Sequence, residues 1–170
     1  MIEYIPVIIA LFSFFGKNKK YMILINLIIA IFLGTLFFFK GAYSGTITLF
    51  FVVIIGSYCF ITDKKINKNI AVLTIFFISL ILFGVNYYFN NTVTLLNFVP
   101  LIAFSLSRFA ELSCDEFWYR VNSIIALSIY SIYAYIYQSY PIILTECVLI
   151  FFNFYYLLKN NFILNFKYKY

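Results

Sequence analysis

Histidine is absent from this chain of 170 residues, and its absence excludes several kinds of chemistry at once. Without an imidazole there is no Ser-His or Cys-His nucleophile pair, no His-ligated zinc or haem and no histidine proton relay. The sequence also lacks a GxGxxG loop, a Walker-type loop and an HExxH motif. Its three cysteines have no CxxC spacing and predict no disulfide framework. We therefore expect neither an enzyme nor a metal or cofactor site.

Charged residues are scarce as well. They make up 11% of the chain, against about 25% in an average soluble domain, whereas 65% of the residues are hydrophobic and 24% are aromatic. Most segments are apolar on every face, which suits lipid better than water. The composition predicts an all-α integral membrane protein whose net charge of +6 meets lipid headgroups rather than nucleic acid.

Seven apolar runs are interpreted as transmembrane helices. They are Ile2–Phe15, Tyr21–Phe39, Tyr43–Ile61, Ile70–Tyr88, Val93–Phe109, Trp118–Tyr137 and Tyr140–Leu158. The last run would form a helix of about 28 Å, close to the roughly 30 Å thickness of the hydrocarbon core. The first run is short, but it is interpreted as a span rather than a cleaved signal, because Glu3 stands where basic residues belong.

Alternate crossings by these seven runs place nearly all basic residues on one side of the membrane. That side holds Lys17, Lys19, Lys20, Lys64, Lys65, Lys68, Arg108, Arg120, Lys159, Lys167 and Lys169, and Lys40 alone lies opposite. Loops rich in lysine and arginine stay in the cytoplasm. We therefore predict a bacterial inner (plasma) membrane protein with its N-terminus outside and its C-terminus in the cytoplasm.

A weak internal repeat relates the first three spans to the last three. Pro6 aligns with Pro100, and the same alignment matches Ser13 to Ser107. If the fourth span is a connector, both repeats enter the membrane from the same side, as in transporters with parallel repeats. The predicted organisation is 3+1+3, with a first repeat, a linker helix, a second repeat and an interfacial cytoplasmic tail at 1–62, 63–91, 92–159 and 160–170.

Glu146 is the leading functional candidate because it lies about 9 Å inside the outer end of the seventh run. A carboxylate at the centre of a membrane helix costs about 2.5 to 3.5 kcal/mol, so such residues usually face protein or a watered cavity. Residues seven apart share a helix face, which puts Ser139, Glu146 and Asn153 on one stripe. Glu146 could bind a cation, a proton or a hydroxyl-rich solute. The alternative is a carboxyl that only packs against Tyr or Ser hydroxyls.

Further pathway candidates lie on the fifth and sixth spans. Tyr130 and Tyr133 offer aromatic faces and hydroxyls to a polar solute, although aromatic-belt or core packing explains them about as well. Asn97, near the outer end of the fifth span, is either a pathway residue or a packing residue. Arg108 is interpreted as an anchor at the membrane interface that pairs with Glu111, one turn further along the helix.

Pro6 and Pro100 occupy equivalent places in the two repeats and are the candidate hinges. Proline removes a backbone hydrogen bond and permits a helix to bend. For Pro6 the preferred alternative is a place in the first turn of its helix, where proline is tolerated.

Two stretches resemble known membrane proteins. The run Gly16-Lys-Asn-Lys-Lys20, with Phe37-Phe-Phe-Lys-Gly-Ala-Tyr-Ser-Gly45 after an apolar helix, resembles the first half of YgjV-type bacterial inner-membrane proteins. Arg120 with the Tyr-rich helix after it, Glu146 and Tyr155-Tyr156 resemble their second half. These proteins are distantly similar to the SWEET and PQ-loop transporters. That resemblance implies a 3+1+3 fold, solute-binding asparagines near the positions of Leu49 and Glu146, and proline hinges.

The leading hypothesis is a small SWEET-like carrier that moves a small polar solute by alternating access. Its two three-helix bundles would rock about a midplane site lined by Glu146, Asn153, Tyr130, Tyr133 and Asn97. The alternative is a non-transporting membrane scaffold or assembly protein, in which the polar stripes are interhelical hydrogen bonds worth about 0.6 to 2 kcal/mol each. The expected partners are membrane lipid, a small polar solute and, as an open alternative, a second copy of the chain.

Overall fold

The computed structural model describes residues 2–15, 18–62, 66–90 and 95–159, and across these ranges it is helical and contains no strand. Its first span is a short α-helix between two 3-10 turns, η1 (Ile2–Tyr4) and η2 (Phe12–Phe15). The α-helices are α1 (Ile5–Leu11), α2 (Lys19–Phe39), α3 (Tyr43–Thr62), α4 (Lys68–Asn90), α5 (Leu95–Ser113), α6 (Glu116–Ile136) and α7 (Tyr140–Lys159). The seven predicted helices are therefore confirmed.

The largest boundary error concerns α5, which was predicted to end at Phe109 but continues to Ser113. Its last turns carry Arg108 and Glu111, whose side chains form an i,i+3 ion pair. Such a pair lies on one face of the helix and neutralises both charges, so the helix continues past the apolar run.

Four helices are long and apolar enough to cross a membrane, within the part of the chain that the structure describes: α2, α3, α4 over Lys68–Val85, and α7. Helices α5 and α6 have similar lengths, 19 and 21 residues, but are less apolar, with Arg108 and Glu111 in α5 and Glu116 and Arg120 in α6. Large apolar side chains cover the outside of the bundle, for example Phe76 and Phe77 of α4, which are 57% and 62% exposed. A surface of this kind is stable in lipid and unfavourable in water.

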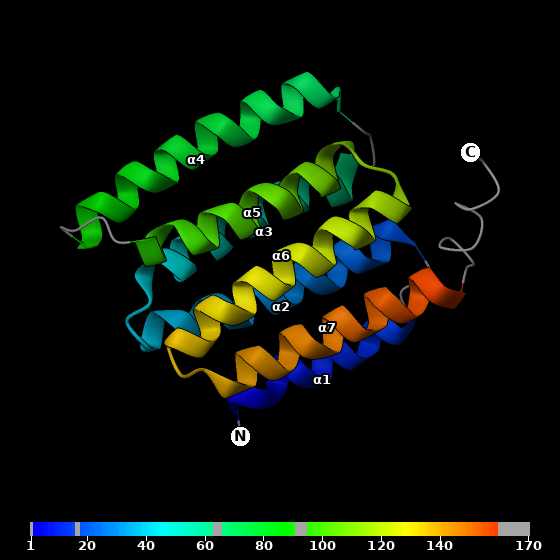
Figure 1. Ribbon diagram of the computed structural model, residues 1–170, viewed down its shortest axis with the longest axis horizontal. Helices are drawn as coiled ribbons and strands as arrows, with labels where there is room; N and C mark the ends of the chain where they lie inside the picture. The colour runs from blue at the N-terminus through cyan, green and yellow to red at the C-terminus, as the bar shows by residue number, and fades with distance from the viewer. Residues whose placement is uncertain (1, 16–17, 63–65, 91–94, 160–170) are drawn as a thin grey trace.

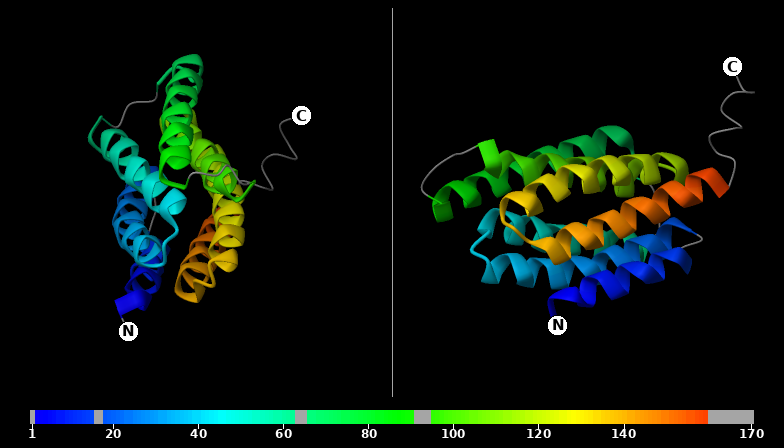
Figure 2. Two further views of the ribbon diagram at one scale, coloured as in Figure 1. Left: turned by 90° about the vertical axis from the view of Figure 1, so that its left-hand side faces the viewer. Right: turned by 60° about the horizontal axis from the view of Figure 1, so that its bottom comes forward.

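The helices form two layers that lie side by side along their length (Figures 1 and 2). One layer is α1, α2 and α3. The other is α7, α6 and α5, with α4 packed at its edge against α5. The layers touch through α1 with α7 and through α3 with α5, whereas the backbones of α2 and α6 between them stay further apart. The middle of the bundle therefore has room for large side chains and for a cavity.

The turns that follow α2 and α6 have the same backbone geometry and lie at the same end of the bundle (Figure 1). After α2, Gly41 has a φ of +71°, and the Ala42 N–H donates to the Phe37 carbonyl at 2.9 Å. After α6, Gln138 has a φ of +51°, and the Ser139 N–H donates to the Ala134 carbonyl at 2.9 Å. Both are Schellman motifs, in which a left-handed residue ends the helix. They hold α2 to α3 and α6 to α7 as tight antiparallel pairs.

Candidate functional site

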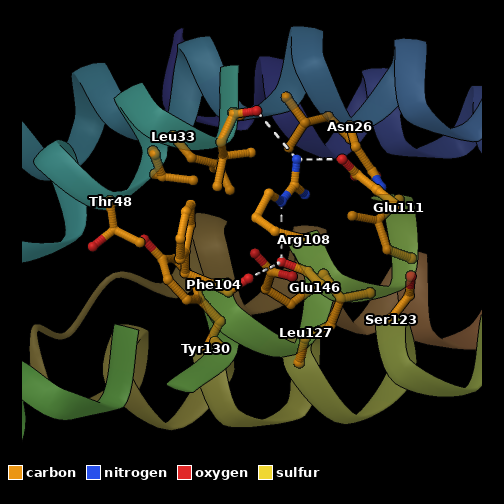
Figure 3. A pocket seen from close by; sticks show the side chains of 18 residues that line it. Asn26, Leu33, Thr48, Phe104, Arg108, Glu111, Ser123, Leu127, Tyr130 and Glu146 are labelled. Atoms are coloured by element: carbon orange, nitrogen blue, oxygen red, sulfur yellow. Dashed lines mark hydrogen bonds and ion pairs between the residues drawn. The ribbon is translucent and has the colours of Figure 1, made fainter. Parts of the chain in front are cut away.

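A cavity of about 80 Å³ lies between the two layers, near the middle of the helices (Figure 3). Its walls come from α2, α3, α5, α6 and α7. The polar residues that line it are Asn26, Thr48, Ser107, Arg108, Glu111, Ser123, Tyr130 and Glu146. The other lining residues are apolar, among them Leu33, Leu49 and Phe104. Polar groups are thus set into a hydrophobic wall, as in many small-molecule sites.

Glu146 enters this cavity from the middle of α7 (Figure 3). The predicted stripe of Ser139, Glu146 and Asn153 faces the interior of the bundle, since these side chains are 0%, 2% and 2% exposed. Among the described residues, Glu146 Oε2 has no hydrogen-bond partner. The packing alternative, a carboxyl bonded to Tyr or Ser, therefore has no support at this oxygen. A buried polar atom without a partner is unusual, and this one lies where a ligand or water can bind.

Arg108 and Glu111 line the cavity opposite Glu146. Arg108 Nη1 lies 2.5 Å from Glu111 Oε2 and donates to the Val52 carbonyl of α3 at 3.1 Å. Arg108 Nε donates to Ser107 Oγ at 3.3 Å. The predicted pairing is present, and both side chains are buried between the layers. The arginine points into the gap between the layers because carbonyl and carboxylate acceptors are available there.

Tyr130 and Tyr133 close one end of the cavity against the start of α3. The Tyr130 hydroxyl donates to the Gly45 carbonyl at 3.2 Å, and the Gly45 N–H donates to the Tyr133 hydroxyl at 3.1 Å. Phe37 of α2 packs against both tyrosine rings, with centroid distances of 5.7 and 5.4 Å. A Cβ on Gly45 would lie 2.8 Å from Tyr133 Cε1, so the close approach of α3 to α6 requires a residue without a side chain.

The opposite end of the cavity is closed by contacts from the start of α2. Asn26 Nδ2 donates to the Tyr119 hydroxyl of α6 at 3.0 Å. Lys19 Nζ donates to the carbonyls of Glu111 and Cys114 at 2.6 and 3.0 Å, and so satisfies the free carbonyls at the C-terminus of α5. The two layers are thus joined by polar contacts at both ends of the cavity.

The remaining predicted pathway residues differ in their positions. Tyr130 lines the cavity, but Tyr133 and Asn153 are buried beside it and do not line it. Asn153 Nδ2 donates to the Leu149 carbonyl at 2.9 Å, and its Oδ1 has no partner among the described residues. The side chain of Asn97 lies outside the part of the chain that the structure describes.

Six of the polar lining residues had no predicted place in a pathway: Asn26, Thr48, Ser107, Arg108, Glu111 and Ser123. Asn26 and Thr48 come from the first layer, and their facing direction depends on how that layer packs. An arginine within a mostly apolar run, with a glutamate one turn further along, was the sequence signal that could have placed this pair in the site.

The candidate hinge prolines also differ from each other. Pro6 lies in the first turn of α1, as the alternative interpretation predicts, and it is buried. Pro100 lies inside α5, beyond the first turn, where its ring removes a backbone hydrogen bond. Of the two, Pro100 has the position of a hinge.

Seven packed helices with a lipid-compatible surface and a buried polar cavity define a multi-pass integral membrane protein. The chain belongs to the Imp-YgjV family of bacterial inner membrane proteins, whose sequence profile matches residues 1–161. The predicted family and the inner-membrane location are therefore confirmed. No curated protein and no solved structure matches the chain.

Proposed function

We propose that the protein is a small inner-membrane carrier that moves a small polar solute by alternating access, with the cavity as its solute site. The observation that supports this function is the buried Glu146 carboxylate, whose Oε2 faces a cavity without a partner among the described residues. Burying a carboxyl group in an apolar interior is unfavourable whether it stays ionised or takes up a proton. Ionisable residues inside membrane helices therefore usually belong to a solute, ion or proton site, which favours binding over packing alone.

The arrangement of the helices supports two parallel three-helix repeats, α1 to α3 and α5 to α7, with α4 as the connector. If the two repeats are exchanged, α1 takes the place of α5 and α7 takes the place of α3. The contact of α1 with α7 then corresponds to the contact of α5 with α3, and both contacts occur. The same exchange superposes the α2–α3 turn on the α6–α7 turn, which share the Schellman geometry. Parallel repeats of this kind place a solute site at their interface, near the membrane midplane.

The contacts between the layers suit a rocking motion. At one end the link is Gly45 with Tyr130 and Tyr133. At the other end it is Asn26 with Tyr119 and Lys19 with the carbonyls of Glu111 and Cys114. A neutral hydrogen bond contributes about 0.5 to 1.5 kcal/mol and one from a charged group about 1.5 to 3 kcal/mol, so either set can break while the other holds. Breaking one set would open the cavity to one side of the membrane, with α5 bending at Pro100.

The scaffold alternative predicts tight packing around Glu146. A cavity at this residue favours the carrier, because a scaffold needs close packing between its helices and not a cavity lined by a glutamate.

Cysteine accessibility tests the carrier directly. In a background with Cys59, Cys114 and Cys147 replaced, Leu149→Cys probes the cavity wall and Leu144→Cys probes the outer face of the same helix, where Leu144 is 48% exposed. A carrier that alternates will let a water-soluble, membrane-impermeant thiol reagent modify Leu149→Cys from either side, and will leave the lipid-facing Leu144→Cys unmodified. Protection of Leu149→Cys from both sides would refute the carrier and support the scaffold.

Uptake into proteoliposomes is the functional measurement. A screen of sugars, nucleosides, small acids and amines identifies the solute, and Glu146→Gln then abolishes its uptake while the protein stays folded. Thr145→Val is the matched control, because Thr145 is buried on α7 next to Glu146 and its hydroxyl donates only to the Pro141 carbonyl of its own helix.

A further inference from the structure

Three of the four hydroxyl groups that line the cavity donate their hydrogens to backbone carbonyls. Thr48 Oγ1 donates to the Ser44 carbonyl at 2.7 Å, and the Tyr130 hydroxyl donates to the Gly45 carbonyl at 3.2 Å. Ser107 Oγ donates to the carbonyl of Phe104 at 3.1 Å. A hydroxyl has one hydrogen and two lone pairs. These hydroxyl groups can therefore offer a ligand only their lone pairs, which accept hydrogen bonds.

Two of the three nitrogens of Arg108 are engaged in the same way. Its Nη1 serves the Val52 carbonyl and Glu111, and its Nε serves Ser107. Because Glu111 pairs with the guanidinium at 2.5 Å, the acidic group left without an ionic partner among the described lining residues is Glu146. The cavity offers acceptors, and a bound cation would stabilise the ionised form of the Glu146 carboxyl.

Size limits the ligand further. The cavity measures about 80 Å³, whereas an apolar cavity of about 150 Å³ holds benzene. A hexose, with twice as many heavy atoms as benzene, does not fit this state of the site. Leu33, Leu49 and Phe104 leave an apolar wall next to the polar groups, which suits a short alkyl group.

We propose that the cavity binds a small cation of the ammonium type, such as ammonium or methylammonium, with its N–H donors directed to Glu146 and to the lone pairs of Thr48 and Tyr130. An ammonium group has donors and no acceptor, so it complements a cavity that offers acceptors. Figure 3 shows Glu146 at the centre of the cavity, with Thr48 and Tyr130 toward one end. This inference rests on the proposed function, since it names the solute class of the same site.

Equilibrium binding to the purified full-length protein in detergent tests the ligand class. Isothermal titration with methylammonium chloride is expected to show saturable binding, and Glu146→Gln is expected to weaken it at least about tenfold, since a charge-assisted hydrogen bond is lost. Thr48→Val is expected to weaken it by a smaller factor. Thr145→Val, on the same helix and outside the cavity, is the control and is expected to bind as the unmodified protein does. Melting temperature and elution profile show that each variant is folded.

Two comparison ions sharpen the measurement. Tetramethylammonium has the same charge but no N–H donor, and sodium has the charge without directional donors; neither is expected to compete with methylammonium. Equal competition by either ion, unchanged affinity in Glu146→Gln, or no saturable binding would overturn the proposal. Methylammonium binding without uptake in proteoliposomes would refute the carrier and keep the cation site. Uptake of another solute without methylammonium binding would refute the cation site and keep the carrier.

Discussion

Arg108 and Glu111 form an ion pair inside the bundle, with 2.5 Å between Nη1 and Oε2 and side chains that are 5% and 1% exposed. The guanidinium also reaches across to the Val52 carbonyl and so connects α5 to α3. A buried pair of this kind gains little net stability, but removing one partner leaves an uncompensated charge in the interior. The pair therefore holds the second layer to the first and keeps the Arg108 charge from neutralising Glu146.

Glu111→Gln is expected to destabilise the protein by about 3 to 5 kcal/mol, because it leaves the Arg108 charge buried without its ionic partner. The measurement is the melting temperature of the purified protein in detergent. The double variant Arg108→Met with Glu111→Leu is expected to recover most of that loss, since apolar side chains of similar volume fill the same space. A Glu111→Gln protein as stable as the unmodified one would show that the pair does not have this role.

Gly45→Ala is expected to destabilise the contact between α3 and α6 by about 1 to 3 kcal/mol, as overpacking does in a core. The added Cβ would lie 2.8 Å from Tyr133 Cε1 and 3.2 Å from Phe37 Cδ2, so the rings would have to move. Gly84→Ala is the matched control, because a Cβ there meets nothing within 4 Å. Its melting temperature is expected to stay the same or rise slightly, since alanine favours a helix. Equal effects of the two changes would contradict the close approach at Gly45.

Gln138→Gly is expected to stabilise the protein by about 1 kcal/mol, because Gln138 is held in the left-handed region at a φ of +51° and glycine adopts that region without strain. The measurement is again the melting temperature, with Gln138→Ala as the control for loss of the side chain. The alanine variant is expected to show no gain, since it keeps the Cβ that causes the strain. A gain in Gln138→Ala equal to that in Gln138→Gly would argue against backbone strain.

Reporter fusions test the predicted orientation. A reporter that fluoresces only in the cytoplasm is expected to be active at the C-terminus and inactive at the N-terminus, because the predicted seven crossings would place the ends on opposite sides. The positive-inside rule predicts that the lysine-rich side is the cytoplasmic one. Activity at both ends would require an even number of crossings and would contradict the 3+1+3 arrangement.

The helices could be predicted from the sequence because every apolar run after the short first one is close to the length of a membrane span and short segments separate the runs. The facing direction of α7 could also be predicted, because a period of seven residues puts Ser139, Glu146 and Asn153 on one face and all three are buried. These features depend on residues close together in the chain.

The extent of the cavity could not be predicted in this way. Asn153 shares the helix face of Glu146, but the cavity is shorter than the helix. The prediction of the buried face was therefore correct, although it included a residue that does not line the cavity. Asn26 and Thr48 line the cavity because α2 and α3 turn these positions toward α6 and α7, and such long-range packing leaves no local pattern. The spacing of Arg108 and Glu111 predicted that the two side chains pair, but not that the pair is buried between the layers.

The contact between the first helix and the last affects how the chain can assemble. Phe14, just after α1, packs against Phe152 and Tyr155 of α7, with ring centroids 5.6 and 6.1 Å apart. During synthesis Phe14 is made before helices α2 to α6, whereas its partners on α7 are made after them. This aromatic contact therefore forms only after the other described helices have been translated, and the side of the first helical segment that α7 covers stays uncovered until then.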